Sequence, residues 1–296
     1  MLGHYLSARF MGRPARYARD LLILSRPVAA LCAGAELLVG AHLARQISRP
    51  LADAAVLLRE GIAISLVTAA VNVVNDIRDV RADAISRPHR PLPAGRLSTP
   101  DAWRLASLQG ISALMLSVGV PAGPAVTLAL LLIGIGYSYL FKGTVLAGNL
   151  VVAFLAATPI MYGARLGGVE PGPALITAII IFLFMFAYEV LKTIRDAIAD
   201  SAAGYRTVAT QWGIRSTAVI FRISLTAYAF IAVALTLFVV SAYYVFVIWL
   251  AAVIPSLIVG WRFPVDRSPV AVQRVLRVMA LSWVAGLVVL PLVFRG

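Results

Sequence analysis

The sequence predicts an all-α integral membrane protein with nine transmembrane helices, formed as a single domain over residues 1–296. Hydrophobic residues make up 61% of the chain and charged residues only 13%, and the mean hydropathy of +0.90 lies far above that of soluble domains. The apolar runs are continuous and lack the alternation that strands of a membrane β-barrel require. The loops leave no room for a second, soluble domain, so we expect one helical bundle around a central chamber.

Nine apolar segments are each close to the ~20 residues that a bilayer core requires. They cover residues 24–42, 60–80, 103–120, 122–141, 144–164, 171–192, 215–240, 242–261 and 272–294. The residues before the first segment are basic, but Arg26-Pro27 interrupts the start of the apolar run and no small-residue cleavage site follows it. We therefore expect an uncleaved arm on the membrane surface.

The basic residues predict the orientation, because loops that face the cytoplasm carry an excess of Lys and Arg. With a cytoplasmic amino terminus, most of the 26 basic residues fall in inner segments. The outer segments hold only Arg45, Arg49, Arg59, Arg165 and Arg295. We expect a plasma-membrane protein whose net charge of +13 meets anionic lipids, and no nucleic acid partner, because the basic residues are spread over several loops.

Two acidic segments of nearly the same sequence stand at the ends of apolar runs, on the predicted cytoplasmic side. They are Asn75–Asp83 and Lys192–Asp200, and a shift of 117 positions aligns Asp79 with Asp196 and Asp83 with Asp200. An internal duplication and convergence on one site chemistry both explain this similarity. In either case, carboxylates at the ends of membrane spans indicate a functional site.

Helical geometry predicts that each segment presents one polar face, since positions i, i+4, i+7 and i+11 lie on one stripe. The faces consist of Asn72, Asn75, Asp76, Asp79 and Asp83 on one helix, and of Glu189, Thr193, Asp196 and Asp200 on the other. Mg²⁺ prefers carboxylate and amide oxygens and leaves coordination positions for phosphate. Together the two faces would hold a diphosphate, although charges that merely end two helices and pair with nearby arginines are the alternative.

Asn75–Ser98, read as NDIRDVRADAISRPHRPLPAGRLS, resembles the first signature of the UbiA-type membrane prenyltransferase superfamily. Asp196–Asp200 is similar to its second DxxxD motif, and Gly204–Thr207 and Tyr137–Pro159 resemble two further family segments. Within the superfamily, the RPHRPLPAG turn looks most like geranylgeranylglyceryl phosphate prenyltransferases and chlorophyll synthases. Thr193 and Ala199 depart from the usual residues of those relatives, which leaves the acceptor open.

The resemblance implies Mg²⁺-dependent transfer of a prenyl group from an allylic isoprenyl diphosphate to a lipophilic acceptor in the membrane, at a site that faces the cytoplasm. It implies two metal ions, one held by Asn75, Asp79 and Asp83 and the other by Asp196 and Asp200. Asp79, Asp196 and Lys192 are the expected catalytic residues. The expected substrate-binding residues are Arg26, Asn72, Asp76, Arg78, Lys142, Asn149 and Tyr188. Arg78 could equally serve only to balance the neighbouring negative charge, and Asn149 could equally form a hydrogen bond between helices.

Other functions share parts of this pattern. A terpene cyclase or a transferase acting on phosphoribose diphosphate fits the same motifs, whereas a transporter predicts charges at the bilayer midplane rather than at one surface.

Glu36 stands alone within the first apolar segment, and either lines the chamber or bonds a neighbouring helix. On the fifth segment, small residues such as Ala156 and Gly163, with Pro159, leave room for a second molecule or for close helix packing.

Overall fold

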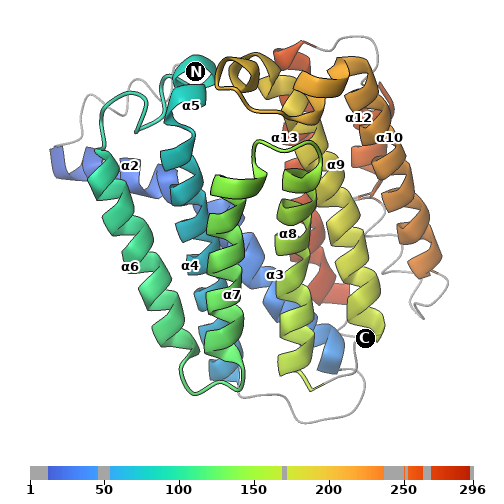
Figure 1. Cartoon of the computed structure of the whole chain (residues 1–296). Coiled ribbons are helices and arrows are strands. Elements are labelled where there is room, and N and C mark those ends of the chain that lie inside the picture. The colour runs from blue at the N-terminus through green and yellow to red at the C-terminus, as the bar shows by residue number, and fades with distance from the viewer. Residues whose placement is uncertain are drawn as a thin grey trace.

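The computed structural model describes residues 13–45, 54–168, 172–236, 250, 253–262 and 268–293, and this part of the chain is helical (Figure 1). The helices are α2 (Arg13–Ser25), α3 (Pro27–Arg45), α4 (Ala54–Arg78), α5 (Val80–Ser86), α6 (Thr99–Ser117), α7 (Gly123–Gly136), α8 (Ala147–Leu166), α9 (Gly172–Ala202), α10 (Val208–Thr236), α12 (Ile254–Arg262) and α13 (Pro269–Val293). One π-helical turn, Tyr137–Phe141, continues α7.

Six of these helices are long and apolar enough to cross a membrane, and a seventh span results if the bent pair α2 and α3 counts as one. The predicted class, an all-helical membrane protein, is confirmed, but nine spans are not established. Helix α6, which covers most of the predicted span 103–120, is not among the six. Half of the predicted span 242–261, and residue 294 at the end of the span 272–294, lie outside the described residues.

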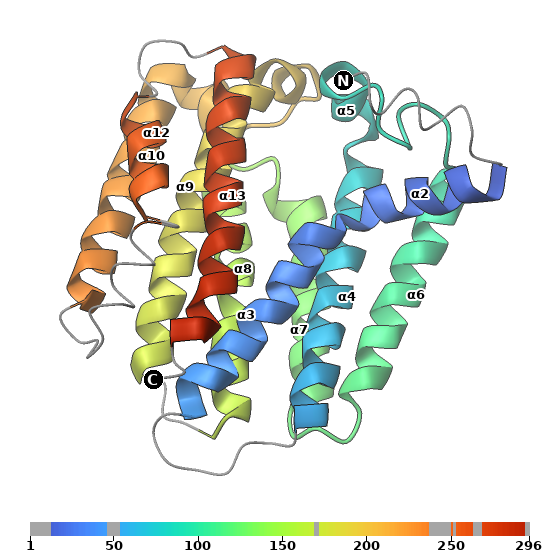
Figure 2. The ribbon, with the colours of Figure 1, turned by 180° about the vertical axis from the view of Figure 1, so that it is seen from behind.

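The bundle places α4 and α9 on opposite sides of α8, and α3 crosses behind them (Figures 1 and 2). Helix α3 packs against α4 and α8, and α9 packs against α8, α10 and α13. Helix α2 runs across the others at the end that carries α5 (Figure 2). The α5 end of the bundle therefore gathers α2, α5, the loop 87–98 and the turn between α9 and α10.

Glycine allows α3 and α8 to approach closely. A Cβ atom at Gly163 would meet the Leu37 carbonyl oxygen, and one at Gly40 would meet the Ile160 carbonyl oxygen. Helices in a membrane associate through such small residues, because lipid offers no hydrophobic driving force. Gly163 therefore serves helix packing and does not leave room for a second molecule.

The two acidic segments fold differently at their ends. Helix α4 ends at Arg78, and Asp79 is the residue before α5, so the predicted polar stripe passes through a break in the helix. Helix α9 instead continues past the predicted end at residue 192 as far as Ala202. Asp196 and Asp200 consequently lie on one uninterrupted helix, whereas Asp79 lies between α4 and α5 and Asp83 lies in the first turn of α5.

Candidate active site

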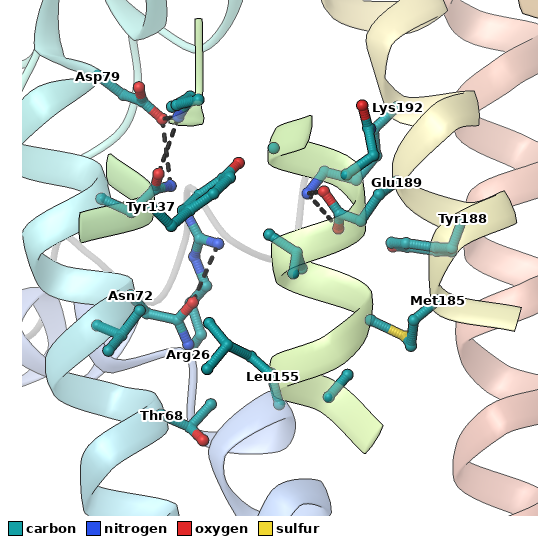
Figure 3. A pocket seen from close by; sticks show the side chains of 18 of the residues that line it. Arg26, Thr68, Asn72, Asp79, Tyr137, Leu155, Met185, Tyr188, Glu189 and Lys192 are labelled. Atoms are coloured by element: carbon teal, nitrogen blue, oxygen red, sulfur yellow. Dashed lines mark hydrogen bonds and ion pairs between the residues drawn. The ribbon is translucent and has the colours of Figure 1, made fainter. Parts of the chain in front are cut away.

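A cavity of about 670 Å³ lies inside the bundle between α4 and α9, with further walls from α3, α8 and α13. Charged side chains gather at its α5 end. Figure 3 shows Arg26, Asn72 and Asp79 on one side, with Glu189 and Lys192 facing them from α9. Away from this end the walls become apolar.

The cavity brings together most of the site residues predicted from the sequence. Those that line it are Arg26, Asn72, Asn75, Asp79, Asp83, Lys142, Asn149, Tyr188, Lys192, Asp196 and Asp200. Asp76 and Arg78 do not line it. Asp76 is buried in ion pairs with Arg26 and Arg90, and the Arg78 guanidinium lies 4.5 Å from the centre of the Tyr139 ring.

Lys142 is the partner of the first acidic segment. Its ammonium group forms an ion pair with Asp79 and lies 2.9 Å from Asn75 Oδ1. The π-helical turn places it there, since the Lys142 amide donates to the Tyr137 carbonyl at 2.8 Å. Tyr205 adds its hydroxyl at 3.5 Å from Asp79 Oδ1. The pKa of Tyr205 is raised to about 12, mainly by burial and to a lesser degree by the negative charge of Asp79. Its hydroxyl therefore stays protonated at neutral pH.

Arg87, in the loop after α5, links the two acidic segments. It donates to Asp83 Oδ1 at 2.8 Å, and to both carboxylate oxygens of Asp196 at 2.8 and 2.9 Å. Arg195 holds the same Asp196 carboxylate at 2.7 Å, and Arg90 holds Asp83 Oδ2 at 2.7 Å. Burial alone lowers the pKa of Arg87, but Asp196 and Asp83 outweigh it and raise that pKa, so the guanidinium stays charged.

Two groups on α9 face this network. Lys192 Nζ lies 2.7 and 2.8 Å from the carboxylate oxygens of Glu189, one turn earlier. The Asp200 side chain lines the cavity, and no hydrogen bond or ion pair joins it to a described residue, whereas the Asp200 backbone carbonyl accepts from the Tyr205 amide at 2.8 Å. Apart from Asp200, the carboxylates that line this end are thus already paired with basic side chains.

The donor set suits a hard cation. Asn75, Asp79, Asp83, Asp196 and Asp200 offer carboxylate and amide oxygens around one cavity, which is the ligand chemistry of Mg²⁺. Within the described residues, no three His, Cys, Asp or Glu side chains gather closely enough to hold a metal ion. Basic groups lie between the carboxylates instead, so metal binding requires Arg87 and Lys142 to give up their present partners.

Several lining residues were not among those predicted for the site. They are Arg87, Arg90, Arg195, Tyr137 and Tyr205. Glu36 lines the apolar end, which was one of the two alternatives for this residue. The sequence did contain a signal for Arg87 and Arg90. Buried carboxylates require cationic partners, and both arginines stand in the RPHRP turn that follows the first acidic segment. Their pairing could not be inferred, because it depends on the path of the loop 87–98.

The comparisons with known proteins agree with this geometry. The model of the UbiA prenyltransferase family matches residues 36–286. The digeranylgeranylglyceryl phosphate synthase of Methanoculleus marisnigri is 34% identical over 200 residues, which cover 66% of this chain and 69% of that protein. The enzyme of the same name from Sulfolobus acidocaldarius is 34% identical over 165 residues, 55% of this chain and 59% of the relative.

Solved structures share the fold. A UbiA homologue from Aeropyrum pernix K1 aligns with a TM-score of 0.73 at 17% identity, over 90% of this chain and 98% of that one. A UbiA homologue from Archaeoglobus fulgidus, bound to DMAPP and Mg²⁺, aligns with a TM-score of 0.68 at 19% identity, over 92% and 99%. The family match spans most of the sequence, and the predicted assignment to a membrane prenyltransferase is confirmed: this protein belongs to the UbiA prenyltransferase family.

Proposed function

We propose that this protein transfers the prenyl group of an isoprenyl diphosphate to a lipophilic acceptor within the membrane, and that the cavity between α4 and α9 is its active site. The observation that carries this proposal is the division of the cavity. A cluster of carboxylates and cations at one end adjoins an apolar space at the other. An isoprenyl diphosphate has the same two-part character.

The charged end suits ionisation of the diphosphate. An allylic C–O bond breaks readily only when the charge that develops on the departing diphosphate is neutralised. Lys142, Lys192 and Arg26 line this end and would donate N–H groups to phosphate oxygens. Mg²⁺, when bound, would neutralise the same charge as a Lewis acid. In this proposal Asn75, Asp79 and Asp83 hold one ion, and Asp196 and Asp200 hold a second.

The apolar end suits the hydrocarbon chain and the allylic cation. Val67, Leu155, Phe184 and Met185 line it, which keeps water away from a carbocation that would otherwise be hydrolysed. Tyr188 lines the cavity between the two ends, and its ring face would stabilise positive charge. The C–O bond to the diphosphate breaks first, and the acceptor oxygen then attacks the first carbon of the allylic cation to form the new C–O bond, while its proton passes to the released diphosphate.

The acceptor is a lipophilic alcohol in this proposal. Relatives at 34% identity carry the name digeranylgeranylglyceryl phosphate synthase, which supports a glyceryl phosphate lipid as the first compound to test.

We also propose that the chain is one domain with nine spans and a cytoplasmic amino terminus, in the plasma membrane. The charged end of the cavity then faces the cytoplasm, in agreement with the distribution of basic residues.

Product analysis tests the proposal. Purified protein is incubated with Mg²⁺ and geranyl, farnesyl or geranylgeranyl diphosphate, with and without glyceryl phosphate lipids or phenols. A prenylated acceptor supports the proposal. Cyclised hydrocarbon as the main product, formed at a rate that no acceptor changes, would overturn it in favour of a terpene cyclase. Arg104→Gln is a suitable control, because the Arg104 side chain is 78% exposed and away from the cavity.

A further inference from the structure

Glu36 is the one carboxylate among the described lining residues that lies outside the charged end. It stands on α3 and is only 4% exposed, yet it forms part of the cavity wall. No ion pair joins it to a described basic residue, whereas Asp79, Asp83 and Asp196 each have at least one. A buried carboxylate without a cationic partner is costly, so its position calls for an explanation.

Its depth follows from the helix contacts. Glu36 lies ten positions along the chain from Arg26, which corresponds to about 15 Å at an α-helical rise of about 1.5 Å per residue. Its neighbour Leu37 contacts Gly163 of α8, which is about 20 Å along that helix from Asn149. Glu36 therefore lies at the far, apolar end of the cavity, well below the charged groups. In Figure 3 Leu155 and Met185 mark the direction of this end.

Trp283 of α13 lines the cavity together with Glu36. Its indole N–H is a polar neighbour of the Glu36 carboxyl group. The Trp283 ring in turn stacks on Phe184 of α9, with 4.8 Å between ring centres and an angle of 19°. Phe184 is 1% exposed, so this contact is part of the packed core. Glu36, Trp283 and Phe184 thus join α3, α13 and α9 in a rigid floor of the cavity.

This floor has mixed chemistry. Its walls are apolar, but the accessible edge of the Glu36 carboxylate faces the cavity. A hydrocarbon chain that reaches the floor covers this edge and removes it from water without replacing the lost hydrogen bonds. A chain that ends short of the floor gains apolar contact and avoids this loss.

We propose that Glu36, which lines the cavity beside Trp283, is a specificity-determining residue that limits the length of the isoprenyl chain bound in the cavity. This inference rests on the proposed function, because it places the diphosphate at the charged end and the free end of the chain toward Glu36. An extended geranylgeranyl chain is longer than the distance from Arg26 to Glu36, and a geranyl chain is shorter. The additional isoprene units of the geranylgeranyl chain therefore do not increase the affinity of the protein for the diphosphate.

Binding of unreactive analogues tests this role without relying on turnover. Geranyl and geranylgeranyl thiolodiphosphates are titrated with Mg²⁺ into the wild-type protein, Glu36→Leu and Glu36→Gln in the same detergent. Wild type and Glu36→Gln are expected to bind the two analogues with similar affinity, since both present a polar group. Glu36→Leu is expected to bind the longer analogue at least about tenfold more tightly than the shorter one. The longer analogue partitions more strongly into detergent micelles, but this effect is the same for every variant. It therefore cancels when the ratio of the two affinities is compared between variants.

Trp283→Phe provides a second variant, should Glu36→Leu fold poorly. It keeps an aromatic ring against Phe184 but removes the indole N–H, which leaves the carboxylate less satisfied. Whereas the wild-type protein is expected to bind the two analogues with similar affinity, Trp283→Phe is expected to bind the shorter analogue several-fold more tightly than the longer one. An equal ratio in wild type, Glu36→Leu and Trp283→Phe would overturn the role of Glu36. Failure of the wild-type protein to bind either analogue would instead contradict the proposed function.

Discussion

Arg87 holds Asp196 through two hydrogen bonds of 2.8 and 2.9 Å, although 109 positions separate these residues in the chain. The same guanidinium holds Asp83 at 2.8 Å, so one side chain from a loop joins the two acidic motifs. A cation of the protein thus stands between carboxylates that are proposed to hold Mg²⁺. When a metal–diphosphate complex enters, the carboxylates would exchange Arg87 for Mg²⁺, and Arg87 would become free to contact phosphate oxygens.

Arg87→Gln is expected to lower the free energy of unfolding by about 2 kcal/mol, because it leaves the buried Asp83 and the partly buried Asp196 with one partner fewer. The Arg87 side chain is 22% exposed, which keeps the loss near the lower end of the range for buried pairs. Denaturant or thermal unfolding in detergent measures it. Arg104→Gln, at an exposed ion pair, is the matched control and should have little effect. Equal stability of the two variants would contradict the linking role of Arg87.

Lys192→Gln is expected to reduce kcat by about a hundredfold or more, since a cation that stabilises the departing diphosphate acts mainly in the transition state. The KM for the prenyl diphosphate should change much less. Steady-state kinetics with a saturating acceptor separates the two constants. An increase in KM with unchanged kcat would mean that Lys192 only binds the ground state.

Gly163→Ala is expected to destabilise the protein by about 1–3 kcal/mol, because its Cβ would meet the backbone of α3 at Leu37. Gly136→Ala is the control, since no atom lies within 4 Å of the Cβ position there. Thermal unfolding of the two variants in one detergent gives the comparison. A loss at Gly136 as large as that at Gly163 would contradict the account of the contact between α3 and α8.

Topology gives a separate prediction. Ser98 lies in the loop at the α5 end, and Gly168 follows α8 at the opposite end of the bundle (Figure 1). Single cysteines at these positions, in a chain with Cys32→Ala, are expected to react with membrane-impermeant reagents from opposite sides of intact cells. Gly168 should be labelled from outside. Labelling of both from one side would refute the proposed orientation.

Much of this fold could be predicted from the sequence, because long apolar runs and carboxylates at helical spacing are strong local signals. The cavity indeed contains both acidic motifs. The break at Asp79 was not apparent, since the residues around it continue a helical pattern. The count of nine spans is more than the six or seven that the described helices support, partly because α6 is less apolar than the run 103–120 suggested.

The basic partners were harder to predict for a physical reason. Arg87, Arg90 and Tyr205 belong to connections between helices, and their positions depend on tertiary contacts rather than on periodicity. Asp76 shares a helical stripe with Asp79 and Asp83 in the sequence, but Arg26 and Arg90 draw it into a buried pair outside the cavity lining. Glu36 could only be placed once α13 brought Trp283 against it.

The most direct test is the dependence of prenyl transfer on Mg²⁺ and on both acidic motifs in one purified preparation. Product formation is measured for wild type, Asp79→Asn and Asp196→Asn, with Mg²⁺ and with excess EDTA, after thermal unfolding has shown that the variants are folded. The proposed function predicts that EDTA abolishes the wild-type product, that added Mg²⁺ restores it, and that each substitution removes at least about 99% of the activity. Undiminished product in EDTA, or full activity in either folded variant, would contradict it.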